Sequence, residues 1–357
     1  MILERCGRCK APIYVRLAAS WNQDGTVTGR FASKTRVVQV YADEIDYILS
    51  GISERIGLDI SRIVTEGERK AGLDFTGAIF AKLGGLVGVL SRSFLFRRLV
   101  FVFVLKAAKN AGFGDCHLVE YRHRRRMVVR FRDPFNPPIL SGNMLGAFEA
   151  FSQRPGTVDW EVAGDVATMT ITSDGPADRI GDERLEPVLP PTLPGDYHVE
   201  RCPRCRMPIE IGRRYHFDLK KGIATEVETG RRIVTVMVES LTAIFGELAG
   251  ELGDEVGRMV VELESEYIEG IAPRGEQATE GVLRGLLGDL CIKGMGNPVS
   301  VSVGDAEIEV RVENPFSEEM LAGRVLGFHR AIFGGPADVE WTPDRAGFMT
   351  IRTRGQT

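Results

Sequence analysis

The chain has 357 residues, of which 43% are hydrophobic and 26% are charged, enough for two domains with hydrophobic cores and a solvated surface. Its formal net charge is -4, so global electrostatics gives no case for a nucleic-acid binder. The N-terminus lacks the charged region and apolar core of a secretory signal. Four of the six cysteines lie in CxxC pairs, which indicates thiolate chemistry in a reducing compartment, and we expect a cytoplasmic protein.

The chain begins with a segment that it repeats past its midpoint. The sequence RCGRCKAPI at 5–13 matches RCPRCRMPI at 201–209, which lies 196 positions later. The same offset relates TRVVQV at 35–40 to RRIVTV at 231–236. Further matches follow in the same order at offsets of 180 to 182: GFGD with GMGN, RDPF with ENPF, and two copies of MTI. This ordered agreement indicates a tandem duplication.

Both copies predict the same elements in the same order, most clearly in the second copy. Strand-like stretches are marked by alternation and Gly-containing turns, and helices by apolar residues at helical spacing. In chain order, we expect strands over 208–236, helices over 239–271, a hairpin over 298–316 that turns at Gly304-Asp305, a helix over 318–334, and two closing strands over 337–342 and 347–353.

These elements predict the α+β class. We expect two homologous domains, each an antiparallel sheet with helices packed on one face, arranged as an intrachain pseudo-dimer. The first domain is expected over residues 1–172 and the second over 200–354, each with a zinc-ribbon-like CxxC segment at its start. Between them, 173–199 is rich in proline and acidic residues, which favours an extended linker.

The order of signals in each copy resembles the vinyl-reductase-type domain, a predicted hydrocarbon-binding module. The second copy carries GRRIVTV, LTAIFGELAGELG, GMGNPVSVSV, VRVENPF and GRVLGFHRAIFGGPADVEW, and the first carries a weaker set. The resemblance implies a helical layer beside an antiparallel sheet, a dimer, and an apolar pocket near its interface. Many relatives have a cysteine pair after an acidic residue near the C-terminal end. Here the stretches directly after Glu161 (VAGDVATMTI) and Glu340 (WTPDRAGFMTI) contain no cysteine, so a site built on that pair is not expected.

The two CxxC pairs predict one shared metal site. Structural zinc takes four Cys or His ligands, and each copy supplies two cysteines with no second pair of its own. In a pseudo-twofold dimer, Cys6, Cys9, Cys202 and Cys205 would meet near the axis and hold one structural Zn²⁺. A redox role for each CxxC, and a site completed by a partner chain or by His216, remain as alternatives.

Other features have ordinary structural interpretations. Cys116 and Cys291 do not match each other and are expected to be free thiols, at least partly buried. His329 is expected to be a surface or satisfied histidine, with a pocket-facing histidine as the alternative. The basic run at 121–126 is expected to be a solvated hairpin turn, with a site for an acidic partner or nucleic acid as the alternative. The apolar run at 84–106 contains three arginines, which argues against a transmembrane span. It is interpreted as a core helix, a pocket or protein-partner helix, or an interfacial membrane segment.

No catalytic constellation or cofactor fingerprint recurs between the copies, so the chain leans away from an enzyme. The sequence and the resemblance together favour a tandem protein whose two copies are held together by zinc; the resemblance implies that it binds an apolar small molecule, or acts as a sensor or adaptor for a partner. An accessory enzyme of tetrapyrrole or hydrocarbon metabolism and a structural subunit of a larger complex are the alternatives.

Overall fold

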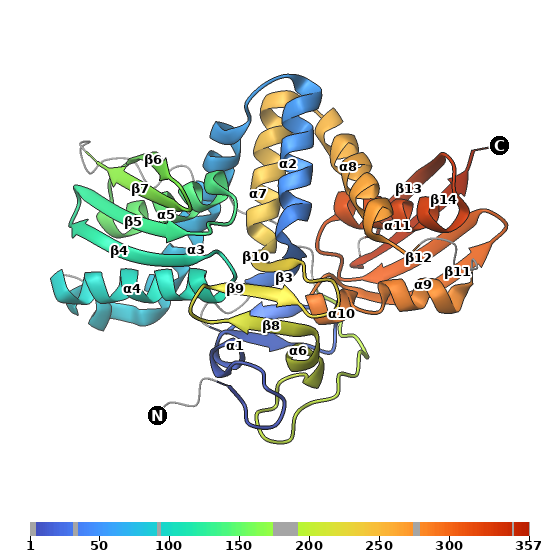
Figure 1. Cartoon of the computed structure of the whole chain (residues 1–357), viewed down its shortest axis with the longest axis horizontal. Helices are drawn as coiled ribbons and strands as arrows, with labels where there is room; N and C mark the ends of the chain where they lie inside the picture. Colours follow the sequence, from blue (N-terminus) through green and yellow to red (C-terminus); the bar gives the residue numbers. More distant parts are fainter. Residues whose placement is uncertain are drawn as a thin grey trace.

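Three antiparallel sheets and their helices make up the computed structural model (Figure 1). It describes residues 5–30, 35–90, 94–173, 192–273, 279–344 and 346–356, without the side chains of 79–90, 94–97, 100 and 103. We call residues 5–173 the first half and residues 192–356 the second half. The α+β class predicted from the sequence is confirmed, and one sheet is shared by the two halves.

The shared sheet joins the halves through its two central strands. Its order is β1 (Ala19–Trp21), β2 (Val27–Gly29), β3 (Arg36–Tyr41), β10 (Arg232–Met237), β9 (Ile223–Glu226) and β8 (Tyr215–Asp218). In the β3–β10 ladder, Gln39 lies opposite Thr235, the residue 196 positions later. Equivalent residues therefore face each other, and a pseudo-twofold axis passes through this pair. Buried valines on both strands give the ladder the β-branched character of a central strand pair.

Each central strand runs directly into a helix that packs on the opposite half. In α2 (Ala42–Ile56), the buried Ile45, Ile48, Leu49 and Ile52 follow helical spacing. This helix packs on α8 (Glu255–Ile271), and α7 (Val238–Leu252) packs on α3 (Ser61–Leu90). These four helices, which we call the central helices, stand together above the shared sheet (Figure 1). The halves are therefore intertwined through their helices as well as paired through a strand.

The outer sheets have the same strand order in both halves. One is β4 (Asp115–Arg122), β5 (Arg126–Arg132), β7 (Val166–Thr172) and β6 (Thr157–Ala163); the other is β11 (Asn297–Gly304), β12 (Glu307–Glu313), β14 (Phe348–Gly355) and β13 (Ala337–Pro343). Each carries one long helix, α5 (Pro137–Ser152) or α11 (Glu318–Phe333). These helices pack on α3 and α8 of their own half, so each outer sheet is tied to the central helices.

The remaining helices lie around this framework. They are α1 (Ile13–Ala18), α4 (Phe94–Asn110), α6 (Ile209–Arg214), α9 (Glu280–Leu287) and α10 (Leu290–Lys293). The expectation of strand-like backbone directly after the second CxxC was wrong, because 209–214 forms α6. Gly212 lies so close to Cys9 that a Cβ added to Gly212 would be 1.7 Å from the Cys9 carbonyl oxygen. The same helical turn buries Ile211 beside the cysteines.

Two further expectations concern segments that the structure describes in part. Of the predicted linker, 174–191 lies outside the described residues; 192–199 forms no helix or strand, and Tyr197 donates its N–H to the Gln23 carbonyl. The interpretations of 84–106 depend on side chains of which most lie outside the description. Among the described residues, no helix combines the length and apolar character needed to cross a membrane.

Candidate functional site

The two CxxC segments, near the start of the chain and near residue 200, lie at the end of the molecule opposite the central helices (Figure 1), and their four thiols gather in one cluster. The Sγ atoms of Cys6 and Cys202 lie 3.9 Å apart, and those of Cys9 and Cys205 lie 3.4 Å apart. All four sulfur atoms lie within 4.8 Å of one another, and all four residues are buried and free of disulfides. Each close pair joins equivalent cysteines of the two halves, so the pseudo-twofold axis of the shared sheet also passes through this cluster.

Each CxxC pair sits in a tight turn that closes on itself. Cys6 donates its N–H to the Ala11 carbonyl at 2.9 Å, and Lys10 donates its N–H to the Cys6 carbonyl at 3.0 Å. The second copy repeats both bonds, from Cys202 and Arg206, at 2.8 and 2.7 Å. Lys10 and Arg206 both have a φ of 63°, the left-handed conformation that ends such a turn. The turn therefore holds both sulfur atoms of a pair on the same side.

One arginine of each turn binds it to the opposite half. Arg201 donates from Nη2 to the Trp21 carbonyl at 2.6 Å, and Arg5 donates to the Phe217 carbonyl. Trp21 lies in β1 of the first half and Phe217 in β8 of the second, again 196 positions apart. Each cysteine turn is thus held against the hairpin of the other half by a bond from its first arginine.

The protein environment favours a thiolate at the first cysteine of each pair. Burial opposes ionisation of Cys6, but backbone N–H groups of Cys9 and Arg8 outweigh it and lower the pKa to about 6. The backbone N–H of Cys205 lowers the pKa of Cys202. Burial raises the pKa of Cys9 to about 12 and also raises that of Cys205. The four thiols therefore respond as one coupled group, in which the first proton lost makes the next harder to lose.

The donor set and its spacing fit a metal ion. A tetrahedral centre with metal–sulfur bonds of about 2.3 Å places its sulfur atoms about 3.8 Å apart, close to the distances between the equivalent cysteines. Four thiolates are the soft ligands that zinc and iron take in closed sites. Among the described residues, no histidine or carboxylate joins this group, so His216, exposed on β8, is not brought to it.

A second candidate site is a groove of about 640 Å³ between α1, α4 and β4. We call it the α1–α4 groove. Apolar side chains and basic groups both line it: Leu17, Val102, Leu105, Leu118 and Leu219 are apolar, and Arg98, Lys106 and Lys109 are basic. Lys109 is paired with Asp115, which leaves Arg98 and Lys106 as the other cations of the rim. This combination of groups suits an amphipathic molecule with an anionic end.

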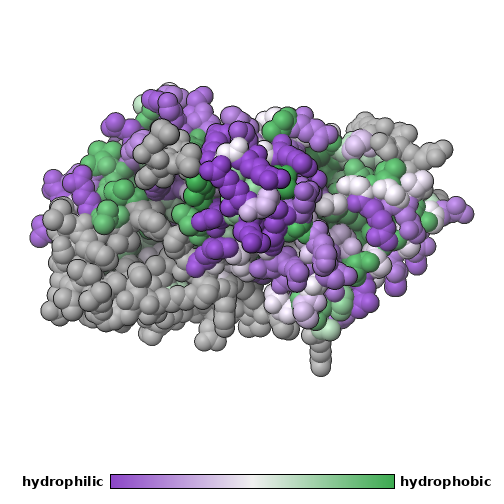
Figure 2. Space-filling model, turned by 90° about the horizontal axis from the view of Figure 1, so that it is seen from below, coloured by the Kyte–Doolittle hydropathy of each residue, from purple (hydrophilic) through white to green (hydrophobic). Residues whose placement is uncertain are grey.

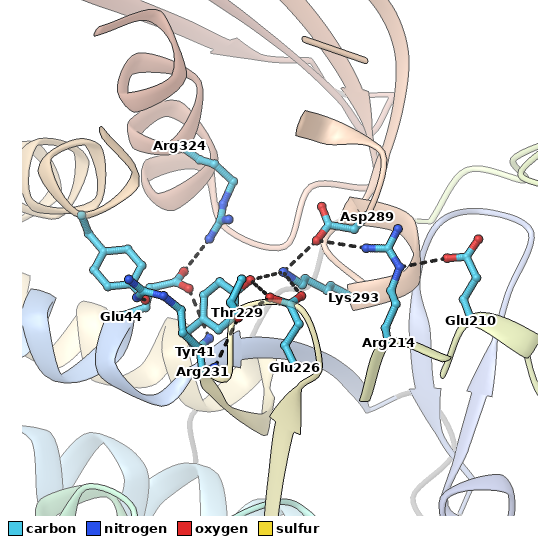
Figure 3. A network of polar contacts seen from close by, with 11 residues as sticks. Tyr41, Glu44, Glu210, Arg214, Glu226, Thr229, Arg231, Asp289, Lys293 and Arg324 are labelled. Atoms are coloured by element: carbon cyan, nitrogen blue, oxygen red, sulfur yellow. Dashed lines mark hydrogen bonds and ion pairs between the residues drawn. The ribbon is translucent and has the colours of Figure 1, made fainter. Parts of the chain in front are cut away.

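A buried ionic network links the halves elsewhere (Figure 3). Arg324 of α11 contacts Glu44 of α2 at 2.6 Å and Glu264 of α8 at 2.9 Å. Beside it, Tyr41 donates to Glu226 at 2.6 Å, and Lys293 pairs with Asp289 at 2.8 Å. Several of these contacts, such as Glu44–Arg324, join a residue of the first half to one of the second. They therefore indicate a structural role in holding the two halves together. None of these residues lines the α1–α4 groove.

The other singled-out residues behave as structural groups. The Cys116 thiol is buried and donates to the Leu105 carbonyl at 3.0 Å, and the buried Cys291 thiol donates to Asn297 at 3.4 Å. His329 is fully buried and its Nδ1 bonds Thr353 Oγ1 at 2.8 Å. The basic run at 121–126 includes the exposed turn between β4 and β5. The ionic network is what sequence reasoning missed. Its members match no motif, and within the Arg324 trio only Glu264 has a glutamate, Glu68, at the equivalent position of the other copy.

Comparisons with known proteins place the chain in no family. No family model and no curated protein matches it. Among solved structures, one titled "Probing the function of heme distortion in the H-NOX family" aligns with a TM-score of 0.24 and 17% identity, over 33% of this chain and 72% of that chain. A point-mutant structure of T. Tengcongensis H-NOX aligns with a TM-score of 0.23 and 16% identity, over 34% of this chain and 75% of that chain. Likenesses this weak carry no conclusion about fold or function, and the vinyl-reductase resemblance stays an expectation.

Proposed function

We propose that Cys6, Cys9, Cys202 and Cys205 hold one structural zinc ion that staples two homologous domains into an intrachain pseudo-dimer. The observation that carries this proposal is the gathering of four buried thiols within 4.8 Å, two from each half. A closed set of four cysteines is typical of structural zinc, which keeps no open position for a substrate. The proposed domains are 1–172 and 200–354, joined by the linker 173–199.

Metal analysis tests this proposal directly. Native mass spectrometry of protein purified without added metal is expected to find one zinc per chain, released on denaturation. Cys202→Ser is expected to abolish zinc retention, because three thiolates no longer close the site. The matched control is Cys116→Ser, since Cys116 is also buried but lies outside the cluster, and it should keep its zinc. Iron in place of zinc, or zinc retained by Cys202→Ser, would contradict the assignment.

We further propose that the stapled molecule is a cytoplasmic, non-enzymatic binding protein, a sensor or adaptor of the vinyl-reductase type. The α1–α4 groove supports a small-molecule ligand, because its apolar lining and basic rim suit an apolar body with an anionic end. An accessory enzyme would need polar groups that converge on the ligand. A structural subunit would use the same helix α4 as a docking face, and Leu99 and Val102 are exposed there.

The dye anilinonaphthalene sulfonate, which is apolar with one anionic group, is a suitable probe of the groove. We expect its fluorescence to rise on binding, and Val102→Asp to weaken binding by at least about tenfold, since one buried charge costs more than about 1.4 kcal/mol. Leu58→Asp is the control, because Leu58 is an exposed leucine outside the groove. Equal loss in both variants would show nonspecific dye binding and count against the groove.

A further inference from the structure

The cysteine end of the molecule carries a concentration of positive charge that the net charge conceals. Residues 5–30 and 201–221 contain twelve lysines and arginines against three acidic residues, a local charge of +9. Since the whole chain carries -4, the rest of it carries -13. The charge is therefore strongly polarised between the cysteine end and the remainder of the protein. Such polarisation steers partners by their sign even when the total charge is small.

Most of these cations are exposed and unpaired. Ten of the twelve are exposed, and within the described chain none of the ten makes an ion pair. They are Arg8, Lys10, Arg16, Arg30, Arg201, Arg204, Arg206, Arg213, Lys220 and Lys221. Figure 2, which views the molecule from this end, shows hydrophilic side chains gathered over the middle of the face. Both halves contribute, so the cations lie on both sides of the pseudo-twofold axis.

Four of the arginines line one groove of about 470 Å³ beside Cys205. They are Arg16, Arg30, Arg201 and Arg206, and Ser20 and Asn22 complete the polar lining. Two of the guanidinium groups are already held in place. Arg201 donates to the carbonyls of Trp21 and Arg206, and Arg30 donates to the Ala19 carbonyl and the Ser20 hydroxyl. Because each guanidinium has five N–H groups, donors remain for an anion.

We propose that this face binds the phosphate backbone of a nucleic-acid duplex. Seven of the ten exposed cations are arginines, whose planar fork matches phosphate oxygens. A protein partner would need apolar or aromatic anchors. In the two segments, Leu17 is the large apolar side chain that is exposed, at 50%, and Trp21 is buried. An exposed aromatic platform for unstacked bases is likewise missing from these segments, which favours a duplex over a single strand.

Binding at this face depends on the charge of the phosphates and not on the base sequence. The phosphates of a duplex lie on its outside, so a broad and rigid array of cations can contact several at once without entering a groove. The cysteine turns and the two hairpins supply that rigidity, because they pack together in one hydrophobic cluster with the four thiols. The proposal goes beyond the small-molecule function above and does not depend on which metal the thiols hold.

Fluorescence anisotropy with a labelled DNA duplex of about 20 base pairs, two helical turns, tests the proposal. We expect the full chain to bind with a Kd of about 10⁻⁴ to 10⁻⁶ M at physiological salt, and log Kd to vary linearly with log salt concentration. The double variant Arg16→Glu/Arg206→Glu should weaken binding by at least about tenfold and reduce the magnitude of the salt slope by about 2. Neither side chain makes a polar contact within the described residues, so folding and metal content should be unaffected.

The matched control is Arg124→Glu/Arg125→Glu, which reverses two exposed charges on the β4–β5 turn far along the chain from the cysteine end. This control should bind as the wild type does, within about twofold. An RNA duplex of the same sequence decides which duplex is preferred. Absence of binding at low salt, equal loss in both double variants, or competition by polyglutamate as strong as by unlabelled duplex would overturn the proposal. The last result would assign the face to an acidic protein.

Discussion

Two buried glutamates at equivalent positions show how the halves diverged at the scale of single residues. Glu68 of α3 accepts a hydrogen bond from Asn143 Nδ2 at 2.9 Å. Glu264 of α8, 196 positions later, instead pairs with Arg324, which also contacts Glu44. One half therefore uses a polar pair and the other an ionic trio at the same place. Burial raises the pKa of Glu68 to about 7, because no cation among the described residues compensates for its lost hydration.

Glu68 should make stability depend on pH. Its folded pKa lies above the reference value of 4.5, so the folded state holds its proton more tightly. The stabilisation is complete below about pH 4.5 and is lost as the pH rises to about 7, a change on the order of 3 kcal/mol. We expect Glu68→Gln to gain stability relative to the wild type over this interval, measured by urea unfolding at several pH values. The exposed Glu54→Gln is the control, and a flat difference for both variants would refute the assignment.

Arg324 should be essential to its trio. Arg324→Met leaves Glu44 and Glu264 buried without a counter-charge, and breaking such a group costs about 3 to 5 kcal/mol. Urea unfolding at neutral pH is the measurement. Adding Glu44→Gln and Glu264→Gln to this variant should recover part of the loss, since the like charges are then removed. Recovery is what distinguishes an uncompensated charge from a simple packing defect.

At the scale of elements, glycines set how closely helices approach. Gly142 and Gly146 of α5 face the backbone of α3, and Gly323 and Gly327 of α11 face that of α8. A Cβ at Gly146 would lie 2.3 Å from the Arg69 carbonyl oxygen and 2.6 Å from the Leu73 nitrogen. Backbone atoms cannot swing aside, so the helix pair would have to separate. The same spacing in both halves explains why these glycines recur in the two copies.

Gly146→Ala should therefore destabilise the protein by about 1 to 3 kcal/mol, even though alanine is the better helix former. Gly246→Ala is the matched control in α7, where an added Cβ meets nothing within 4 Å, and it should stabilise by about 0.5 to 1 kcal/mol. Thermal and urea unfolding of both variants give the comparison. Similar gains in the two variants would mean that α3 and α5 leave room for a methyl group between their backbones.

At the scale of the whole molecule, one closed thiol cluster and one shared strand pair lie on the same pseudo-twofold axis. Cys9 and Cys205 are separated by 196 positions, so a metal bound between them closes a very long loop. Closing such a loop restricts the unfolded chain more than closing a short one does. The cluster lies at the end of the molecule opposite the central helices, so it secures a part of the interface that those helices do not reach.

Metal removal should consequently weaken the whole fold. We expect chelation to lower the free energy of unfolding by about 4 kcal/mol and to lower the Tm of the full chain. Cys202→Ser should already show the lower Tm and should not respond further to the chelator. A Tm that is unchanged by chelation in the wild type would mean that strand pairing and helix packing hold the halves together unaided.

Local sequence patterns predicted many of the helices and strands correctly. Apolar spacing located α7, α8 and α11, and alternation located β11 to β14, because these signals come from neighbours a few residues apart. The backbone after the second CxxC was misassigned as strand-like, because α6 depends on the close approach of Gly212 to Cys9 in the other half. No local pattern contains that contact. The basic residues were visible in the sequence, but their location on one face was not.

The sequence by itself determined that the chain is duplicated, that each copy holds half of a four-cysteine set, and that the class is α+β. These properties follow from repeated letters and short periods, which adjacent residues encode. The tertiary structure alone decided that β3 pairs with β10, that the four thiols lie buried within 4.8 Å of one another, and that the glutamates of the two halves have different partners. It also decided that the cations share one face. All of these depend on residues far apart in the chain, from 75 positions for Glu68 and Asn143 to 196 for the paired thiols, whose mutual placement results from packing.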